Sequence, residues 1–281
     1  MVVESQGGLG NQLFIWAYSR ELQSITRVPV LLDTWRHSLT PNRPFELEPI
    51  LQPGDYLDFS TQKAKPWRGY LARRFSASRL GLALRPNVRR ETALRFDENL
   101  LRAEPGDRLV GYFQSWKYFR SKAPQIRYHL QDFLSTRYNR PDPNYGRPTV
   151  AIHIRRGDFK HRRHRRAHPL LPRSYFRNAL ARLHEQMGDF LPVVYSDEPD
   201  YALDLVQGLC FGEDSILAPR TSDTFEVLAG MSSHSSLIMS NSSLSWWAAW
   251  LMGFENNHIV IPNTWSNDPR FLWSDLIPAQ G

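Results

Sequence analysis

The sequence predicts an α/β protein with mostly parallel sheets, and three observations support this prediction. In the C-terminal half, short apolar runs alternate with segments of helical periodicity, as in β-α-β units. Near the N-terminus, an apolar stub, a glycine-rich loop, an amphipathic helix and a second apolar run follow one another. Between these parts, residues 138–148 are rich in Pro, Asn and Gly, which is typical of a domain boundary. We therefore expect two domains, 1–146 and 147–281, with a tail able to pack back on the first.

The individual elements follow from the spacing of apolar residues. Phe14, Ala17, Tyr18, Leu22 and Ile25 recur at helical spacing and predict the first helix. Apolar runs predict strands at 28–33, 109–114, 149–154, 191–195, 236–239 and 258–262. Helices are expected at 173–187, 201–206, 223–231 and 242–252.

Composition narrows the functional classes. The chain has 281 residues, of which 41% are hydrophobic, and this is ordinary for a packed globular protein rather than a disordered one. The single cysteine, Cys210, excludes an intrachain disulfide and fits a reducing compartment. No apolar run approaches the roughly 20 residues of a membrane helix, and the N-terminus lacks a secretory pattern. We expect a cytoplasmic protein.

The formal net charge is +7, which suits phosphate-bearing ligands, nucleic acid or anionic membranes. Two basic segments contribute to it. Within residues 67–90, one face of a basic helix is predicted by Trp67, Tyr70, Leu71 and Phe75. This helix either packs on the body of the protein or contacts a membrane. The basic run at 160–166 is either a solvated loop or a segment that attracts an anionic donor or acceptor by its charge. Nucleic acid is disfavoured because aromatic residues are not interleaved with the basic ones.

Three predicted strands end in clusters of polar residues, at 153–158, 196–198 and 240–245. In parallel sheets, ligands bind at the carboxyl ends of the strands, in the crevice where the strand order reverses. The coincidence of three clusters therefore predicts a binding site at one edge of the second domain's sheet.

The first cluster contains His153, Arg155, Arg156, Gly157 and Asp158. An arginine at a strand end offers a planar fork for two phosphate oxygens, and the glycine permits a tight turn. Asp158 can hold a guanidinium in place. The alternative is a structural Arg–Asp pair, but two adjacent arginines with a histidine favour the phosphate site.

The third cluster opens a predicted helix. Asn241 or Ser242 can cap it, and together with Ser243 they place free backbone N–H groups where phosphate binds well.

In the second cluster, Ser196 and Asp197 precede another helix. Asp197 either contacts a purine edge or a ribose hydroxyl, or caps that helix. Asp197, Glu198 and Asp200 also resemble a loose metal site. Pro199 and the spacing of these acids in a single cluster favour solvated capping acids over magnesium ligands, so we expect no metal.

The N-terminal glycine-rich loop is not a nucleoside triphosphate-binding loop, because its lysine is missing. Gly8 and Gly10 permit close approach of the backbone to a ligand. Asn11 and Gln12 are then expected as polar groups at the cleft.

Together these motifs resemble the α-1,2-fucosyltransferase family, especially its bacterial members. The matching segments follow the family order and span nearly the whole chain. They lie at 7–14, 45–51, 111–115, 117–119, 153–159, 195–199, 240–251 and 258–265. Trp116 departs from the pattern, because bacterial relatives commonly carry an acidic residue there.

The resemblance implies a GT-B-like fold, with two Rossmann-like α/β domains facing across a cleft. It implies an acceptor-side first domain, a donor-binding second domain, GDP-fucose as donor, inversion at the anomeric carbon and no required metal or other cofactor. By resemblance Arg155 binds the donor diphosphate, supported by His153, Arg156 and Asp158. Ser196 and Asp197 are expected at the guanosine, and the cluster at 241–243 at the phosphates.

The predicted reaction moves L-fucose to a galactose hydroxyl of an oligosaccharide or lipid-linked glycan. Arg155, Asp158 and Asn11 are the candidate catalytic residues. Asp158 either holds Arg155 or accepts a proton, and Asn11 orients the acceptor or the leaving group. The alternatives are a transferase with another nucleotide-sugar donor or linkage, and a nucleotide-sugar binding protein without turnover. An anionic membrane at the inner face of the cytoplasmic membrane is a further candidate partner.

Overall fold

The computed structural model describes residues 1–57, 87–138, 146–157, 169–209, 211, 214–255 and 258–278. Several sequence features lie outside these residues: Asp158, the run at 160–166, Cys210, and residues 67–86 of the basic segment 67–90.

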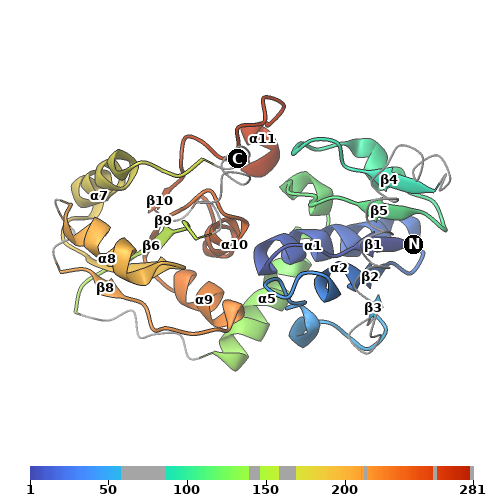
Figure 1. The fold of residues 1–281 in the computed structure, drawn as a ribbon, viewed down its shortest axis with the longest axis horizontal. Coiled ribbons are helices and arrows are strands. Elements are labelled where there is room, and N and C mark those ends of the chain that lie inside the picture. The colour runs from blue at the N-terminus through green and yellow to red at the C-terminus, as the bar shows by residue number, and fades with distance from the viewer. Residues whose placement is uncertain are drawn as a thin grey trace. The chain divides into compact units, whose positions relative to one another are not determined.

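The chain divides into two compact units (Figure 1). The first contains Met1–Ile126 and Leu272–Pro278, and the second contains Arg127–Phe271. The division falls inside helix α5 (Ala123–Arg137), earlier than the sequence places it. The later turns of α5 pack on the second unit, where the Phe133 ring lies 5.0 Å from that of Phe225. Helix α5 was not expected from the sequence.

The first unit is a five-stranded, wholly parallel sheet with the order β3-β2-β1-β5-β4. Its long helix α1 buries Phe14, Tyr18 and Leu22, as the apolar spacing predicts, but leaves Ile25 51% exposed. The elements are β1 (Val2–Glu4), α1 (Leu9–Thr26), β2 (Leu31–Asp33), α2 (Trp35–Ser38), η1 (Glu48–Ile50), β3 (Tyr56–Leu57), β4 (Val88–Arg90), η2 (Glu98–Arg102), β5 (Arg108–Val110), η3 (Trp116–Phe119) and α11 (Trp273–Leu276).

The second unit is another five-stranded parallel sheet, with the order β10-β9-β6-β7-β8. Its central strand β6 is buried at all six positions, which explains the unbroken apolar run in the sequence. The elements are β6 (Thr149–Ile154), α7 (Arg173–Met187), β7 (Leu191–Ser196), α8 (Pro199–Gln207), β8 (Ile216–Leu217), α9 (Thr224–Met231), β9 (Ser236–Ile238), α10 (Ser243–Met252) and β10 (His258–Val260).

The predicted α/β class, with two Rossmann-like units in one chain, is therefore confirmed. Each sheet also contains a point where the strand order reverses. In the first sheet this point lies between β1 and β5, and in the second between β6 and β9. Loops that leave adjacent strands there run in opposite directions, and ligands of parallel sheets bind at such points. The glycine-rich loop follows β1, and the arginine motif follows β6, so both sequence motifs flank these points.

The segment after β5 is anchored by the C-terminal helix α11. Asp275, which is 4% exposed, accepts a hydrogen bond from the Phe96 N–H at 2.8 Å and pairs with the Lys117 ammonium at 2.6 Å. Its carbonyl oxygen accepts the Ser115 hydroxyl at 2.6 Å. One residue of α11 therefore satisfies three groups of the first unit.

Replacing Asp275 with alanine is expected to lower the free energy of unfolding by roughly 2–4 kcal/mol, because a buried N–H and an ammonium lose their acceptor. Denaturant unfolding followed by tryptophan fluorescence measures the change. Glu98→Ala, which removes an exposed ion pair with Arg102, is the control and should cost less than about 1 kcal/mol. Equal midpoints for the two variants would contradict this role of Asp275.

Candidate active site

The carboxyl edge of the second sheet brings together two of the predicted clusters through one ion pair. Arg155 leaves the end of β6, and its Nη1 lies 3.1 Å from Oδ2 of Asp197, which follows β7. Both side chains are about one quarter exposed. The guanidinium is thus held on one side while part of it still faces solvent, which is the arrangement that a phosphate-binding arginine requires.

Asp197 also fixes the backbone of the turn after β6. Its two carboxylate oxygens accept the N–H groups of Arg156 at 2.9 Å and of Gly157 at 3.0 Å. A Cβ on Gly157 would lie only 2.6 Å from Oδ2 of Asp197, so this carboxylate approach requires glycine. Asp197 does not cap α8, since the N-cap residue is Glu198. The helix-cap interpretation of Asp197 was therefore wrong.

Arg156 lies on the other side of the turn and contacts α8. Its guanidinium carbon lies 3.7 Å from the centre of the Tyr201 ring, and its Nε lies 3.3 Å from a carboxylate oxygen of Glu198. The Nε–H is not aligned for a hydrogen bond with any described residue. Arg156 is therefore positioned mainly by stacking on the ring and by charge.

His153 is buried in β6 rather than presented at the surface. Burial, with the nearby Arg155 charge, lowers its pKa to about 4, so its imidazole is neutral at pH 7. Its Nδ1 has no hydrogen-bond partner among the described residues. His153 thus lies beneath the site as an uncharged neighbour of the arginine.

Ser196 connects the two strand ends. Its hydroxyl donates to the Ile154 carbonyl at 2.7 Å and accepts the Glu198 N–H at 3.0 Å. Both of these bonds are internal to the protein. The contact of Ser196 with guanosine stays a prediction.

The Ser/Asn cluster follows β9 across the reversal point. Asn241 is 2% exposed, and its amide donates to the Pro169 carbonyl at 2.8 Å. Ser242 is at the N-cap of α10, but its side chain makes no capping hydrogen bond. Capping by the side chain of Ser242 or Asn241 was therefore not observed, whereas Ser242 and Ser243 are partly exposed at the helix start. This start is suited to an anion by its dipole and N–H groups.

In the first unit, the loop after β1 places Asn11 beside the loop after β5. Asn11 Oδ1 accepts a hydrogen bond from Gln114 at 2.6 Å. Gly7 has a φ of +81°, and a Cβ there would lie 2.5 Å from the Asn11 amide nitrogen. The glycine therefore allows the Asn11 side chain to fold over the loop.

The other predicted residues of this loop differ in accessibility. Gln12 is fully buried, and its amide bonds the backbone of Gly7, Pro44 and Glu46. Gln12 is therefore a structural residue of the first turn of α1, where it holds neighbouring backbone, and not a polar group at the surface. Gly8 is the N-cap of α1, and Gly10 is buried in its first turn.

Three residues near these edges were not singled out by the sequence. Gln114 belongs to a matched motif, but its bond to Asn11 joins positions 103 residues apart. Arg43 extends to 3.1 Å from the Cβ position of Gly8, and Glu91 binds the loop after β5. Arg43 and Glu91 lie in segments without periodic pattern, so no local signal pointed to them.

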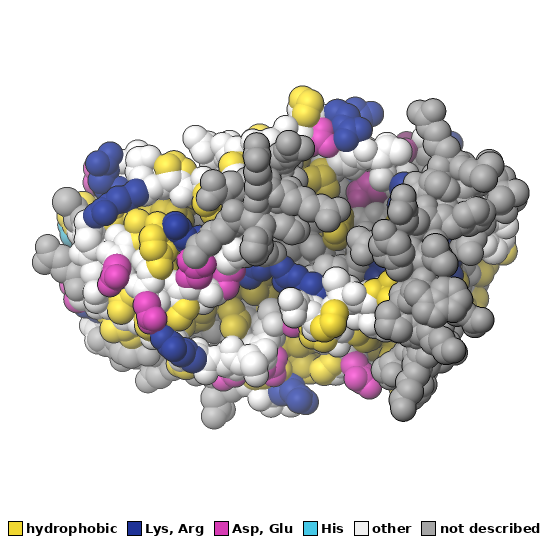
Figure 2. Space-filling model, viewed as in Figure 1, with side chains coloured by type: hydrophobic (Ala, Val, Ile, Leu, Met, Phe, Trp, Pro, Cys, Tyr) yellow, Lys and Arg dark blue, Asp and Glu magenta, His cyan; other side chains and the backbone are white. Residues whose placement is uncertain are grey.

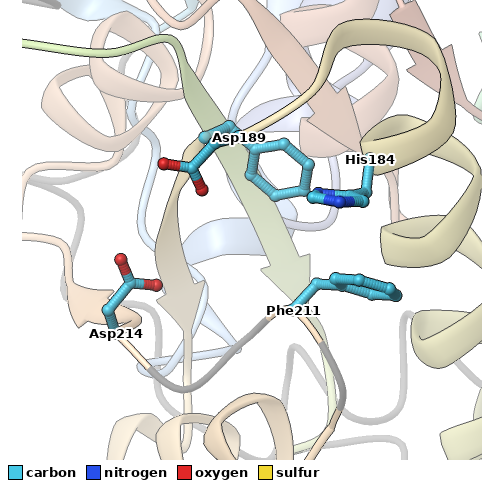
Figure 3. A pocket seen from close by; sticks show the side chains of 5 residues that line it. His184, Asp189, Phe211 and Asp214 are labelled. Carbon is cyan, nitrogen blue, oxygen red and sulfur yellow. The ribbon is translucent and has the colours of Figure 1, made fainter.

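No group of three potential metal-ligating side chains occurs among the residues that the structure describes. A cavity of about 390 Å³ lies elsewhere, lined by His184, Asp189, Phe190, Phe211 and Asp214 (Figure 3). Asp189 and Phe190 precede β7, so this cavity is at the amino edge of the sheet, opposite the arginine cluster.

No helix in the described ranges is long and apolar enough to cross a membrane. On the face shown in Figure 2, described Lys and Arg side chains are interspersed with Asp and Glu. The described surface of that face is therefore mixed in charge.

A model of the family described as glycosyl transferase family 11 matches residues 103–275, which is more than half of the chain. The chain belongs to glycosyl transferase family 11. The match covers β5 and the whole edge that carries Arg155, Asp197 and Ser242. It confirms the family resemblance inferred from the motifs.

Two curated relatives of this family 11 protein come from Escherichia coli. The O-antigen biosynthesis glycosyltransferase WbnK is 29% identical over 121 residues, which cover 42% of this chain and 39% of that protein. An α-1,2-colitosyltransferase is 27% identical over 119 residues, covering 42% and 41%. The matched part thus spans about two fifths of each relative.

Two solved structures are also similar to this family 11 chain. The NodZ α-1,6-fucosyltransferase soaked with GDP-fucose has a TM-score of 0.44 and 14% identity, covering 89% of this chain and 92% of that one. The E. coli ADP-heptose LPS heptosyltransferase II has a TM-score of 0.41 and 11% identity, covering 89% and 81%.

Replacing Asp197 with asparagine should loosen the turn after β6, because an amide NH₂ then faces one of the backbone donors and Arg155 loses its counter-charge. We expect the amides of Arg156 and Gly157 to exchange with solvent at least about tenfold faster, measured by hydrogen exchange. Asp200→Asn, at an exposed acid on α8, should leave both amides unchanged. Unchanged exchange in the Asp197 variant would show that the carboxylate does not hold the turn.

Proposed function

We propose that this chain is an inverting, metal-independent α-1,2-fucosyltransferase that moves L-fucose from GDP-fucose to a galactose hydroxyl of a glycan. Membership of glycosyl transferase family 11 supports sugar transfer. The single observation that carries the donor proposal is the Arg155–Asp197 pair at the carboxyl end of β6.

This pair suits the charge that develops during transfer. When the bond between the sugar C1 and the diphosphate oxygen breaks, GDP leaves with the electron pair and its phosphate gains negative charge. Arg155 is preorganised to receive that charge, and the start of α10 across the reversal point adds backbone N–H groups. These protein groups supply the stabilisation that a metal supplies in other transferases. Arg156, Ser196 and Asn241 complete the proposed donor edge, with His153 beneath it.

The remaining half of the reaction forms the new bond. The acceptor hydroxyl attacks C1 from the face opposite the leaving group, which inverts the anomeric centre, and its proton is released. Asn11 is the proposed orienting group in the first unit, since Gln114 occupies its Oδ1 and leaves the amide N–H groups to donate. Asn11 itself does not take the proton. The part of Asp158 stays a prediction.

The relatives suggest an acceptor and a second donor. One is named as an O-antigen biosynthesis enzyme, so the proposed acceptor is galactose within an oligosaccharide or lipid-linked surface glycan. The other is named as a colitosyltransferase, and this favours a second candidate function in which the same edge binds another nucleotide sugar. Both candidates share the diphosphate, which is what the arginine recognises.

The proposed function also includes a cellular location for the enzyme. A lipid-linked acceptor fits a cytoplasmic enzyme at the inner face of the membrane. Peripheral contact with anionic lipid through residues 67–90 or 160–166 stays a prediction. Residues 67–86 and 160–166 lie outside the described residues.

Turnover with purified wild-type protein tests this function. GDP-fucose, GDP-colitose, GDP-mannose, UDP-galactose and UDP-glucose are each offered with β-galactoside acceptors, with and without EDTA. We expect product from GDP-fucose alone, undiminished by EDTA, with the new α-1,2 linkage read by NMR. Preference for another donor or a requirement for metal would contradict the proposal, and donor binding without any product would indicate a sensor.

A further inference from the structure

A buried carboxyl group lies beneath the loop that follows β5. Glu91 comes directly after β4, and its Oε2 accepts the N–H groups of Tyr112 at 2.7 Å and of Phe113 at 3.0 Å. The Glu91 N–H also donates to the Val110 carbonyl at 2.9 Å. One side chain from the edge strand therefore holds two successive peptide groups of the neighbouring loop.

This loop has a conformation that needs such support. Phe113 has a φ of +51°, in the left-handed region that side chains larger than glycine rarely adopt. Its ring is fully buried and stacks on Tyr18 of α1, with ring centres 4.0 Å apart. Gly111 has no room for a Cβ, which would lie 2.6 Å from the Cβ of Glu91. Carboxylate, stacking and glycine together specify one path for the chain.

The path determines where Gln114 lies. Gln114 is the residue after Phe113, and it donates to Oδ1 of Asn11 at 2.6 Å. The Gln6 amide donates to the Gly111 carbonyl at 3.1 Å and joins the same two loops. The hydrogen bonds of the Glu91 carboxyl to this loop go to backbone groups, and they fix the peptide that delivers Gln114 to Asn11.

We infer that Glu91 is a positioning residue for the proposed transfer, acting by holding residues 111–113 so that Gln114 fixes the amide of Asn11. This inference rests on the proposed function, and it assigns to Glu91 no direct contact with donor or acceptor.

The charge of Glu91 is sensitive to pH near neutrality. Its Oε1 is buried with no hydrogen-bond partner among the described residues, and burial raises the pKa of the carboxyl to about 7 despite the two N–H bonds. The two N–H bonds favour the ionised form, but burial opposes it more strongly, so ionisation weakens the held conformation relative to one in which the carboxyl is hydrated. The hold on the loop should therefore loosen as the pH rises through 7.

Among the described residues, the ionisable groups near Glu91 are two phenols and several side chains that have other partners. Tyr18 on α1 and Tyr118 on η3 face it, and burial raises the pKa of both phenols above their ordinary value. The remaining charged groups around these two tyrosines are engaged elsewhere. They are Arg89 paired with Asp107, Asp97 at the N-cap of η2, and Asp275 paired with Lys117.

The test compares Glu91→Gln with wild type in pH profiles of kcat and KM from pH 6 to 9. The amide keeps the shape and an acceptor oxygen but carries no charge. We expect the two kcat values to agree near pH 6, where both side chains are neutral, and kcat of wild type to fall about tenfold below that of the variant by pH 8, with KM for GDP-fucose changed less than about twofold. Glu98→Gln, at an exposed acid of similar sequence position, should retain the wild-type profile.

A readout independent of turnover separates this inference from the proposed function. Because the folded pKa of Glu91 is raised above its unfolded value, its contribution to stability is complete below about pH 4.5 and is lost as the pH rises through about 7. The wild-type denaturation midpoint should therefore fall, relative to Glu91→Gln, between about pH 4.5 and 7. Carbon-13 NMR titration of the Glu91 carboxyl in wild type gives the same pKa directly.

The outcomes are distinct. A profile of kcat that is the same in Glu91→Gln and wild type overturns the positioning role. A carboxyl that titrates at an ordinary pKa, with parallel midpoints, overturns the pH-dependent hold. Absence of any transfer by wild type defeats the proposed function and the positioning role with it, while the titration still decides how Glu91 binds the loop.

Discussion

In each of the two units, one acid accepts two successive backbone N–H groups of a loop at the carboxyl edge of the sheet. In the second unit Asp197 accepts those of Arg156 and Gly157, and in the first unit Glu91 accepts those of Tyr112 and Phe113. In both units the acid follows one strand and the bound loop follows the neighbouring strand. A glycine within each loop makes room for the acid, Gly157 in one and Gly111 in the other.

The two acids differ in their counter-charge, and this difference suits different tasks. Asp197 pairs with the Arg155 guanidinium, so the same carboxylate shapes the turn and orients a cation for an anionic ligand. Glu91 pairs with no cation among the residues that the structure describes, and burial raises its pKa to about 7. The first arrangement favours a fixed charge at the proposed donor edge. The second favours a loop whose rigidity changes with pH.

Elements were predictable from the sequence where burial leaves a continuous or periodic pattern. The strand at 149–154 and the helix at 173–187 lie where the sequence places them, because one is buried along its length and the other is amphipathic. The strand expected at 109–114 ends at Val110, since Phe113 adopts a left-handed backbone that an apolar run does not reveal. Helix α5 was not expected, although Ile126, Leu130 and Leu134 recur at helical spacing and are buried. Pro124 in its first turn is also compatible with a helix start.

The candidate site was predictable as a set of strand-end clusters, but not as a set of contacts. Arg155 could be chosen from its place after an apolar run, whereas its partner Asp197 is 42 residues away and was first considered as a helix cap. Gln12 was misjudged because its partners, Pro44 and Glu46, lie more than thirty residues further on. Glu91 gave no signal, because its role depends on the pairing of β4 with β5. Such contacts depend on sheet order, which a local pattern does not encode.

The central claim is that Arg155 binds the diphosphate of a guanosine nucleotide at the carboxyl edge of the second sheet. Calorimetric titration of GDP in EDTA, against wild type, Arg155→Ala and Arg147→Ala, tests it most directly, with guanosine as the ligand that lacks phosphate. Arg147 pairs with Asp189 at the opposite edge and is the matched control. The account predicts that Arg155→Ala weakens GDP binding by about 10- to 100-fold while guanosine binding and the control stay unchanged. Equal GDP affinity in wild type and Arg155→Ala would contradict it.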